Sequence, residues 1–322
     1  MFSRLTGLVI ALMVAVMIFA GCGKSPQSTK NASATASNAQ SSASIGTDKN
    51  PIKMAMVPSL DTQKLVVSGE KLAALLEKET GLKFEVAVPT SYTAVITAMG
   101  AGNVDVGWLS PVPYIIAHDR YKVQVALKTV RKGSTDYYSF IIARNDSGIN
   151  KLSDLKGKKF AYGDPVSTSG AIYPKHLVRT SGFNPETFFS NVIYAGAHDR
   201  VVMAVYNKQV DAGAIYGQPG DDARNRVLSV LPDVMKKTHV IAQSLPIPND
   251  TVSLRKDLPP AIAKKIIDGL IKVSKTPEGA KVIYDVGSID GFKPAKDSDY
   301  DSVREVAKAE DITLEKIDRK KK

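Results

Sequence analysis

Three consecutive hydroxyl side chains, Ser167, Thr168 and Ser169, precede Gly170 and follow a short strand-like run. They open a segment with helical spacing. The first turn of a helix has N–H groups without intrahelical acceptors, and the positive end of the helix dipole lies there too. A tetrahedral oxyanion needs this kind of surrounding, with several donors aimed at three or four oxygens and no metal ion. Serine and threonine also commonly cap helices, so the pattern alone leaves capping and anion binding open.

A second candidate, His198, stands at another junction between a predicted strand and a predicted helix. Gly196, just before it, permits close approach of the backbone. An imidazole can donate one N–H to an anion and adds a charge when it is protonated. The alternative is a structural or surface histidine, which is the more common role for a lone histidine.

Two tyrosines and one aspartate complete the set of candidate ligand-binding residues. Tyr92 and Tyr137 can each donate a phenol hydroxyl while their rings wall a cleft. Alternation along a strand lets only one of Tyr137 and Tyr138 face that cleft, and we assign Tyr137. Asp250 follows a proline-rich turn and can accept a proton from a ligand oxygen or pair with an amine. The alternatives are half-buried packing for the rings and a turn aspartate for Asp250.

Nothing in the sequence indicates an enzyme, a cofactor or a metal site. The chain has four histidines and one cysteine, and it lacks the spacings of a metal cluster, a GxSxG nucleophile or a phosphate-binding P-loop. We interpret Asp221-Asp222 as a surface turn rather than a metal ligand pair. Ser59 and Ser110, beside prolines at strand ends, are weaker binding candidates, since open α/β sheets bind ligands at strand ends.

The only cysteine, Cys22, explains the N-terminal segment. Residues 5–20 are uncharged and largely apolar, follow Arg4, and are followed by small residues and Cys22. This is the pattern of a signal peptide over residues 1–21, too short and too interrupted for a membrane-spanning helix. The end of the segment is similar to a bacterial lipobox, with Phe19 in place of the usual leucine. That resemblance implies lipidation of Cys22 and anchoring to the cell membrane, on the periplasmic or external side.

The mature chain then divides into a tether and a folded part. Residues 22–50 are rich in Ser, Ala, Asn and Thr and have almost nothing to bury, which predicts a flexible tether of roughly 30 Å r.m.s. span. The folded part is expected to begin at Pro51 and to be monomeric without the tether. The net charge of +11 is scattered. This charge is consistent with a solvated face, with attraction to an anionic membrane or with electrostatic funnelling of an anion. It does not indicate nucleic-acid binding, because no basic stripe is interleaved with aromatic residues.

Hydrophobic periodicity predicts two similar α/β units. In the first, strands at 52–57, 84–88 and 104–109 alternate with helices at 62–80 and 91–101. Two antiparallel-looking strands at 121–130 and 136–144 lead to the second unit, with strands at 159–163, 191–196 and 210–216 and helices at 169–181 and 198–208. Helices at 259–275 and 277–285 and a charged tail finish the chain. Two such units indicate two doubly wound lobes with a cleft between them.

Seven short stretches stand in order along residues 51–290: Val57-Pro58-Ser59, 91–96 (SYTAVI), 107–111 (GWLSP), 136–139 (DYYS), 163–170 (GDPVSTSG), 196–199 (GAHD) and 246–250 (PIPND). Together they resemble the phosphate, phosphite and phosphonate-binding proteins of ABC importers, the PhnD-type family. The resemblance implies a type II periplasmic-binding-protein fold with its ligand in the cleft. It assigns 51–139 to lobe 1, 140–246 to lobe 2 and 247–322 to the completion of lobe 1 with the C-terminal helices and tail, and it places hinge strands near 139–141 and 245–248.

The function implied is capture of a small phosphorus oxyanion for an ABC permease and its ATPase. Alternatives are the same fold with a sulfonate, a thiamine-like molecule or an amino acid, a sensory lipoprotein, and a hydrolase. No acid ends the strand at 210–216, and Asp250 is the only evident partner for an amine. The sequence therefore favours a compact ligand without an amine, such as phosphite or methylphosphonate, because a buried ammonium needs a carboxylate.

Overall fold

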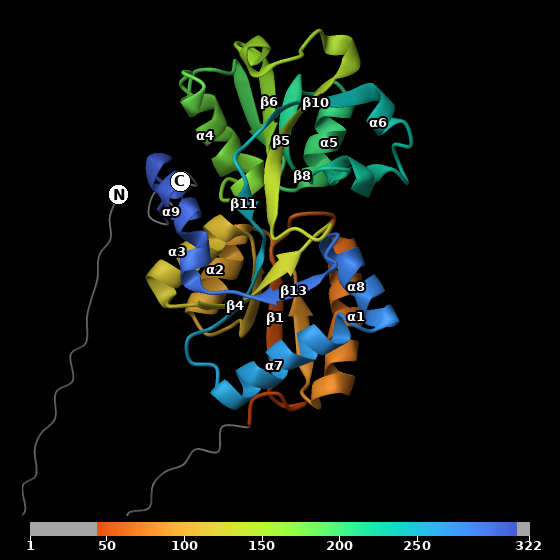
Figure 1. Cartoon of the computed structure of the whole chain (residues 1–322), viewed down its shortest axis with the longest axis vertical. Coiled ribbons are helices and arrows are strands. Elements are labelled where there is room, and N and C mark those ends of the chain that lie inside the picture. The colour runs from red at the N-terminus through yellow and green to blue at the C-terminus, as the bar shows by residue number, and fades with distance from the viewer. Residues whose placement is uncertain (1–43, 314–322) are drawn as a thin grey trace, which may run out of the picture. The chain divides into compact units, whose positions relative to one another are not determined.

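The computed structural model describes residues 44–313, which are built on two β-sheets (Figure 1). The signal peptide, Cys22, most of the tether and the basic end of the tail lie outside the described residues. One sheet has six strands in the order β13-β4-β12-β3-β1-β2, and the other has seven, with β10-β5-β8-β6-β7 as its main path. The expected two-lobed α/β fold is confirmed, with one lobe built on each sheet.

The first sheet is formed by β1 (Ile52–Met56), β2 (Phe84–Ala87), β3 (Val106–Leu109), β4 (Gln124–Val130), β12 (Thr251–Leu254) and β13 (Gly291–Pro294). The pairs of β1 with β2 and β3 are parallel, and the other pairs are antiparallel. Both faces of β1 are buried, because Met54 and Met56 belong to one core cluster while Ala55 and Val57 belong to another. This two-sided burial explains why the strand is a continuous apolar run.

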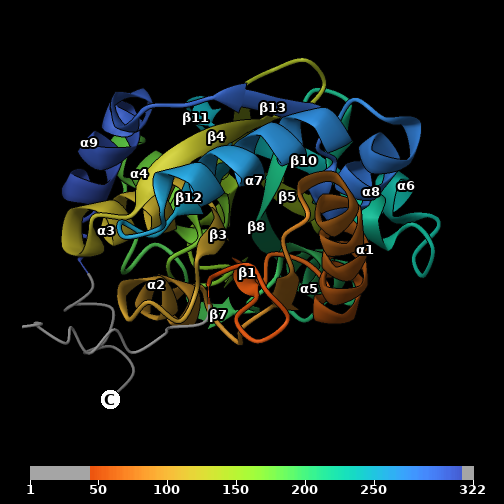
Figure 2. The same cartoon turned by 90° about the horizontal axis from the view of Figure 1, so that it is seen from below.

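Helices cover both faces of the first sheet (Figure 2). On one side α1 (Thr62–Thr80), α7 (Pro260–Val273) and α8 (Pro277–Gly287) share a core cluster with the strands. On the other lie α2 (Tyr92–Gly100) and α3 (Pro111–Tyr121), with α9 (Asp301–Ala309) packed on α3. None of the helices in the described part has both the length and the apolar character needed to cross a bilayer.

The second sheet comprises β5 (Asp136–Arg144), β6 (Lys159–Tyr162), β7 (Asn191–Tyr194), β8 (Ala212–Gln218) and β10 (Thr238–Gln243), with short β9 (Asp221–Asp222) on β8 and β11 (Ile247–Pro248) on β5. One face packs on a π-helical turn η3 (Thr168–Ile172) that runs into α4 (Tyr173–Thr180). The other packs on α5 (His198–Tyr206), η4 (Ala223–Val227) and α6 (Val234–Lys237). Three 3₁₀ turns, η1 (Asn145–Ser147), η2 (Leu152–Leu155) and η5 (Asp297–Tyr300), lie in connections.

The chain passes from the first sheet to the second between β4 and β5 and returns between β10 and β12 (Figure 1). The two strands expected at 121–130 and 136–144 are present as β4 and β5, but they lie in different sheets and do not pair with each other. Residues 111–121 form α3, where no helix was predicted. Much of α3, from Pro111 to Ala117, is buried, so the segment lacks the one-sided apolar stripe by which a helix is found in a sequence.

Two local expectations are corrected by burial. Asp221 and Asp222 are not a surface turn, since their exposed fractions are only 5% and 4%. Asp222 accepts two hydrogen bonds from the Arg224 guanidinium, at 2.9 and 2.7 Å, which compensates its charge inside the fold. Residues 44–50, assigned to the tether, fold back on the first lobe: the Lys83 N–H donates to the Gly46 carbonyl, and Ile45 packs on the core cluster of α1 and β1.

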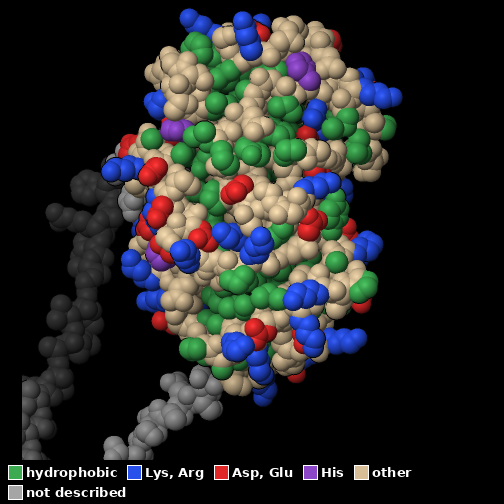
Figure 3. All heavy atoms as spheres, viewed as in Figure 1, with side chains coloured by type: hydrophobic (Ala, Val, Ile, Leu, Met, Phe, Trp, Pro, Cys, Tyr) green, Lys and Arg blue, Asp and Glu red, His purple; other side chains and the backbone are tan. Residues whose placement is uncertain are grey.

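Charged side chains are interspersed over the face seen in Figure 3, where lysines and arginines occur on both lobes with acidic groups between them. No single basic stripe forms on this face. The scattered net charge of the sequence thus corresponds to a mixed surface on this side of the molecule.

We predict that a chain starting at Ser44 is more stable than one starting at Pro51. Both should fold, but the shorter chain loses the contact of Ile45, worth about 1 kcal/mol for a half-buried side chain. Urea unfolding of the two chains measures the difference. Ile45→Ser in the longer chain should reproduce the loss, and the exposed Lys49→Ala is the matched control. Equal unfolding midpoints for the two chains would show that residues 44–50 contribute nothing.

Candidate functional site

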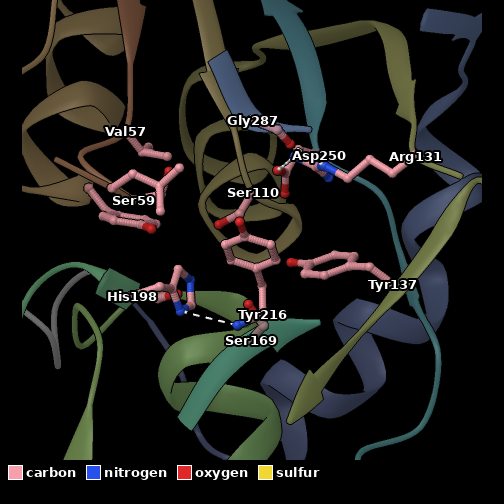
Figure 4. Close-up of a pocket in the computed structure, with 13 residues that line it drawn as sticks. Val57, Ser59, Ser110, Arg131, Tyr137, Ser169, His198, Tyr216, Asp250 and Gly287 are labelled. Carbon is pink, nitrogen blue, oxygen red and sulfur yellow. Dashed lines mark hydrogen bonds and ion pairs between the residues drawn. The ribbon is translucent and has the colours of Figure 1, made fainter. Parts of the chain in front are cut away.

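A small pocket lies where the two lobes meet, with a cavity volume of about 40 Å³. Both sheets contribute to its wall (Figure 4). Its lining comprises Val57, Ser59, Leu60, Tyr92, Ser110, Arg131, Tyr137, Ser167, Ser169, His198, Tyr216, Asp250 and Gly287. Hydroxyl groups predominate among the polar members.

Several helices begin at this pocket. Tyr92 is the first residue of α2, His198 is the first residue of α5, and Ser110 is the N-cap of α3. Ser167 caps the π-helical turn that leads into α4, and its Oγ accepts from the Gly170 N–H at 3.1 Å. Helix N-termini carry partial positive charge, so their convergence favours an anion even where no side chain at these positions is positively charged.

Ser167 and Ser169 both line the pocket. Helix capping and anion binding, the two roles left open for this segment, are compatible in Ser167. Its oxygen accepts from the helix, which leaves its O–H group to donate into the cavity. The carbonyl of Ser169 accepts from the buried Ser139 hydroxyl at 2.6 Å, which fixes the backbone of this residue. Gly170 is required here, because a Cβ would lie 3.1 Å from Cε1 of His198 and 3.2 Å from Cα of Gly163.

Thr168, the third hydroxyl of the segment, is fully buried but does not line the pocket. Its Oγ1 accepts from the Val112 N–H of α3 at 2.8 Å and donates to Ser110 Oγ at 3.2 Å. A residue of the second lobe thus supplies the acceptor for the start of a helix in the first lobe, whose own N-cap, Ser110, accepts no hydrogen bond from the backbone N–H groups of that helix. Thr168 joins the lobes, which differs from the ligand contact that we expected.

His198 is neutral and presents a donor to the pocket. The Tyr216 N–H donates to its Nδ1 at 3.2 Å, so Nδ1 carries no hydrogen and Nε2 carries one (Figure 4). Burial lowers the pKa of His198 to about 4, and the charge of Arg131 acts in the same direction. The additional charge considered for this histidine is therefore absent at neutral pH. Gly196 has φ +83° with open space where a Cβ would be, so it is required for its conformation rather than for close approach.

Three phenol hydroxyls face the same space, from Tyr92, Tyr137 and Tyr216. Burial raises the pKa of each phenol above its usual range, which keeps the hydroxyls protonated and able to donate. The Tyr216 oxygen accepts from Arg226 Nε at 3.2 Å, so its O–H is left for the pocket. Tyr138 packs beside Phe140, with ring centroids 6.3 Å apart, on the other side of β5.

One ion pair lies at the wall, between Arg131 and Asp250, with 2.7 Å from Nη2 to Oδ2. Arg131 follows β4 and is 8% exposed, and its guanidinium also donates from Nε to the Gly287 carbonyl at 2.8 Å. Burial works against its charge, but the Asp250 carboxylate outweighs this effect and the pKa of Arg131 is raised. Figure 4 shows this pair across the pocket from His198.

Of the seven residues predicted from the sequence, the structure brings six to one pocket: Tyr92, Tyr137, Ser167, Ser169, His198 and Asp250. Sequence reasoning missed Arg131 and Tyr216. Arg131 has no distinguishing signal in the sequence, because it stands before Lys132-Gly133 and resembles the other scattered basic residues. Tyr216 was noted only as the last residue of a predicted strand that has no acidic residue at its end. The weaker candidates Ser59 and Ser110 also line the pocket. Within residues 44–313, no group of three His, Cys, Asp or Glu is placed to hold a metal ion.

Comparison with known proteins decides the family. The family model described as "ABC transporter, phosphonate, periplasmic substrate-binding protein" matches residues 54–300. The chain belongs to this family. The PhnD-type resemblance is thereby confirmed, and the protein is a periplasmic-type substrate-binding protein of an ABC transporter.

Two curated relatives of this binding protein are similar over most of its length. It is 30% identical over 280 residues to the phosphate-import protein PhnD of Mycolicibacterium smegmatis, covering 79% of this chain and 84% of the relative. It is 32% identical over 237 residues to the phosphonates-binding periplasmic protein of Escherichia coli, covering 72% and 68%.

Solved structures agree on the fold. A binding-protein component of a phosphonate ABC transporter from Pseudomonas aeruginosa superposes with a TM-score of 0.73 at 26% identity, covering 80% of this chain and 85% of that one. PhnD1 of Prochlorococcus marinus, in complex with methylphosphonate, gives a TM-score of 0.72 at 16% identity, covering 81% and 98%. At that identity the second similarity shows the fold alone.

We predict that Ser169→Ala weakens ligand binding about tenfold or more without unfolding the protein, since one hydrogen bond to a charged group is lost. Titration calorimetry with inorganic phosphate and methylphosphonate measures the affinity, and thermal melting checks the fold. Ser190→Ala, at an exposed serine of the same lobe, is the matched control. Unchanged affinity in Ser169→Ala would show that the Ser169 hydroxyl does not bind the ligand.

Proposed function

We propose that this binding protein captures a small tetrahedral phosphorus oxyanion in the pocket between its lobes and presents it to an ABC permease. The observation that carries the proposal is the donor-rich wall: serine and tyrosine hydroxyls, the Nε2–H of His198 and the starts of several helices face one cavity of about 40 Å³. Because the imidazole is neutral and Arg131 is paired with Asp250, hydrogen bonds and helix dipoles attract the anion rather than an unpaired cation.

The ligand class is supported by the relatives and by the chemistry of the wall. The curated names of the relatives include phosphate import, phosphonate binding and phosphite binding. A sulfonate has no proton at neutral pH, whereas phosphate, phosphite and phosphonates can keep one on oxygen. Asp250, an acceptor in a wall of donors, suits such a proton. A zwitterionic amino acid is disfavoured for the same reason as any amine, because the carboxylate already has a cationic partner.

The pocket binds without catalysing a reaction in this proposal. His198 donates Nε2–H but has no acceptor nitrogen left for a general base, since its Nδ1 receives the Tyr216 N–H. His198 is therefore not available as the base that would make one of the serine hydroxyls a nucleophile.

We propose further that the lobes close about hinges near 139–141 and 245–248, in β5 and in the segment that carries β11, which lie next to the two connections between the sheets. The contact between these hinges supports the idea, because the Ser139 N–H donates to Ser244 Oγ at 2.9 Å. A ligand that touches both lobes shifts the population toward the joined state, in which Thr168 and the start of α3 meet.

We predict that phosphate, phosphite or methylphosphonate raises the melting temperature of the protein, while methanesulfonate has a smaller effect. A ligand that binds only the folded state adds roughly 2.7 kcal/mol at a free concentration 100-fold above its dissociation constant. Differential scanning calorimetry measures the shift, and turnover assays with phosphate esters check for hydrolysis. A chain that melts at the same temperature with all three phosphorus anions would not be a phosphorus oxyanion receptor.

We also propose that the protein is lipidated at Cys22, which lies outside the described residues, and is tethered to the membrane by the segment that follows. Cys22→Ser should therefore move the protein from the membrane fraction to the soluble fraction, because its acyl chains supply the anchor. Immunoblots of the two fractions measure the distribution, with Ser28→Ala as the control. Membrane association that persists in Cys22→Ser would exclude the lipid anchor.

A further inference from the structure

The ion pair at the pocket wall is more elaborate than charge compensation requires. A guanidinium has five N–H groups, and the protein accepts from four of those of Arg131. Besides Asp250 and the Gly287 carbonyl, Thr129 Oγ1 accepts at 3.3 Å and Asn249 Oδ1 at 3.1 Å, both from Nη1. The guanidinium is therefore held in one orientation beside the carboxylate.

Its acceptors come from separate parts of the first lobe. Thr129 belongs to β4, Asn249 and Asp250 precede β12, and Gly287 ends α8. Asn249 is fixed in turn, since its Nδ2 donates to the Ser134 carbonyl at 3.0 Å and its own carbonyl accepts from the Tyr300 hydroxyl at 3.0 Å. Such a framework keeps the positive charge at the pocket whichever ligand fills the cavity.

Asp250 keeps one oxygen for the pocket. Its Oδ2 accepts from Arg131, and its side chain remains 30% exposed while it lines the cavity. A ligand ammonium that bonded to the other carboxylate oxygen would stand only about 5 Å from the guanidinium, given ordinary hydrogen-bond lengths. In a weakly solvated pocket the repulsion at that distance cancels much of the attraction to the carboxylate.

We propose that Arg131 is a specificity-determining residue, which neutralises Asp250 and thereby makes the pocket reject ligands that carry an ammonium group. This inference rests on the proposed phosphorus oxyanion function, and it adds the feature by which the pocket discriminates between phosphorus oxyanions with and without an ammonium group. The oxyanion end of every ligand meets the same hydroxyl wall, whereas an ammonium on the substituent would find one carboxylate in the pocket lining, that of Asp250, which is already paired with Arg131. Alkyl substituents are admitted as far as the cavity allows, and ammonium-bearing substituents of the same size are excluded by charge.

Two ligands of nearly equal size separate charge from volume. Propylphosphonate and 2-aminoethylphosphonate differ mainly by a methyl group in place of an ammonium group, and methylphosphonate serves as a compact reference. Calorimetric titration of the full chain with each ligand should show propylphosphonate bound at least about tenfold more tightly than 2-aminoethylphosphonate, since one unfavourable charge interaction is avoided. Tighter binding of the amine by the unaltered chain would overturn the proposal without any variant.

Two substitutions of Arg131 then test the residue itself. Arg131→Gln removes the charge, and Arg131→Lys keeps it on a different side chain, while both are smaller than arginine. The glutamine variant should reverse the order, so that 2-aminoethylphosphonate binds at least about tenfold more tightly than propylphosphonate. The lysine variant should keep the order of the unaltered chain. Adding Asp250→Asn to Arg131→Gln should abolish the reversal, because the ammonium loses its partner.

The outcomes distinguish this proposal from the function on which it rests. Melting curves and binding of methylphosphonate establish that each variant is folded. A folded Arg131→Gln chain that keeps the original order, or a lysine variant that reverses it, would contradict the role of the Arg131 charge while leaving the oxyanion function intact. Failure of the unaltered chain to bind all three phosphonates would overturn both proposals.

Discussion

The starts of helices need hydrogen-bond acceptors, and this requirement holds the two lobes together at the pocket. The Val112 N–H of α3 donates to Thr168 of the opposite lobe, and the Tyr92 N–H of α2 donates to Asp164 Oδ2 at 3.3 Å. In the reverse direction, the His198 N–H of α5 donates to the Ser59 carbonyl at 3.0 Å. Each lobe thus satisfies groups that the other leaves without an intrahelical partner. The same geometry points several positive helix ends at one cavity.

Around that cavity the formal charges cancel. His198 is neutral because it is buried, the phenols stay protonated for the same reason, and Arg131 and Asp250 compensate each other. An anion is therefore attracted by oriented dipoles and hydroxyl donors that are already in place. Hydrogen bonds to an ionised ligand are stronger than those between neutral groups. Such a wall can therefore bind an oxyanion, while burying its neutral groups costs less than burying an unpaired charge.

Most secondary structure could be predicted because its signals are local. The helix at 62–80 has its predicted bounds, since a one-sided apolar stripe ends at a glycine. Two of the failures share a cause, whereas α9 (Asp301–Ala309) was assigned to the charged tail although its buried residues Val303, Val306 and Ala307 have helical spacing. The helix α3 is apolar on nearly all sides because it is covered by both α2 and α9, and the strands β4 and β5 resemble partners because they are neighbours in the chain. A helix that is buried on several sides has no periodic pattern of apolar residues, and pairing between distant segments has no signal in the local sequence.

The sequence by itself determined the two α/β units, the membership of the PhnD-type family and the hydroxyl-rich helix start, because periodicity and ordered motifs are properties of short segments. Tertiary structure alone decided which side chains share the pocket. It moved Thr168 from the cavity to the junction of the lobes, fixed the hydrogen of His198 on Nε2 through the Tyr216 backbone, and placed Arg131 against Asp250, which is 119 positions away. A charge at the end of a strand looks the same in sequence whether it faces solvent or a carboxylate. Only the fold brings the two groups within hydrogen-bond distance.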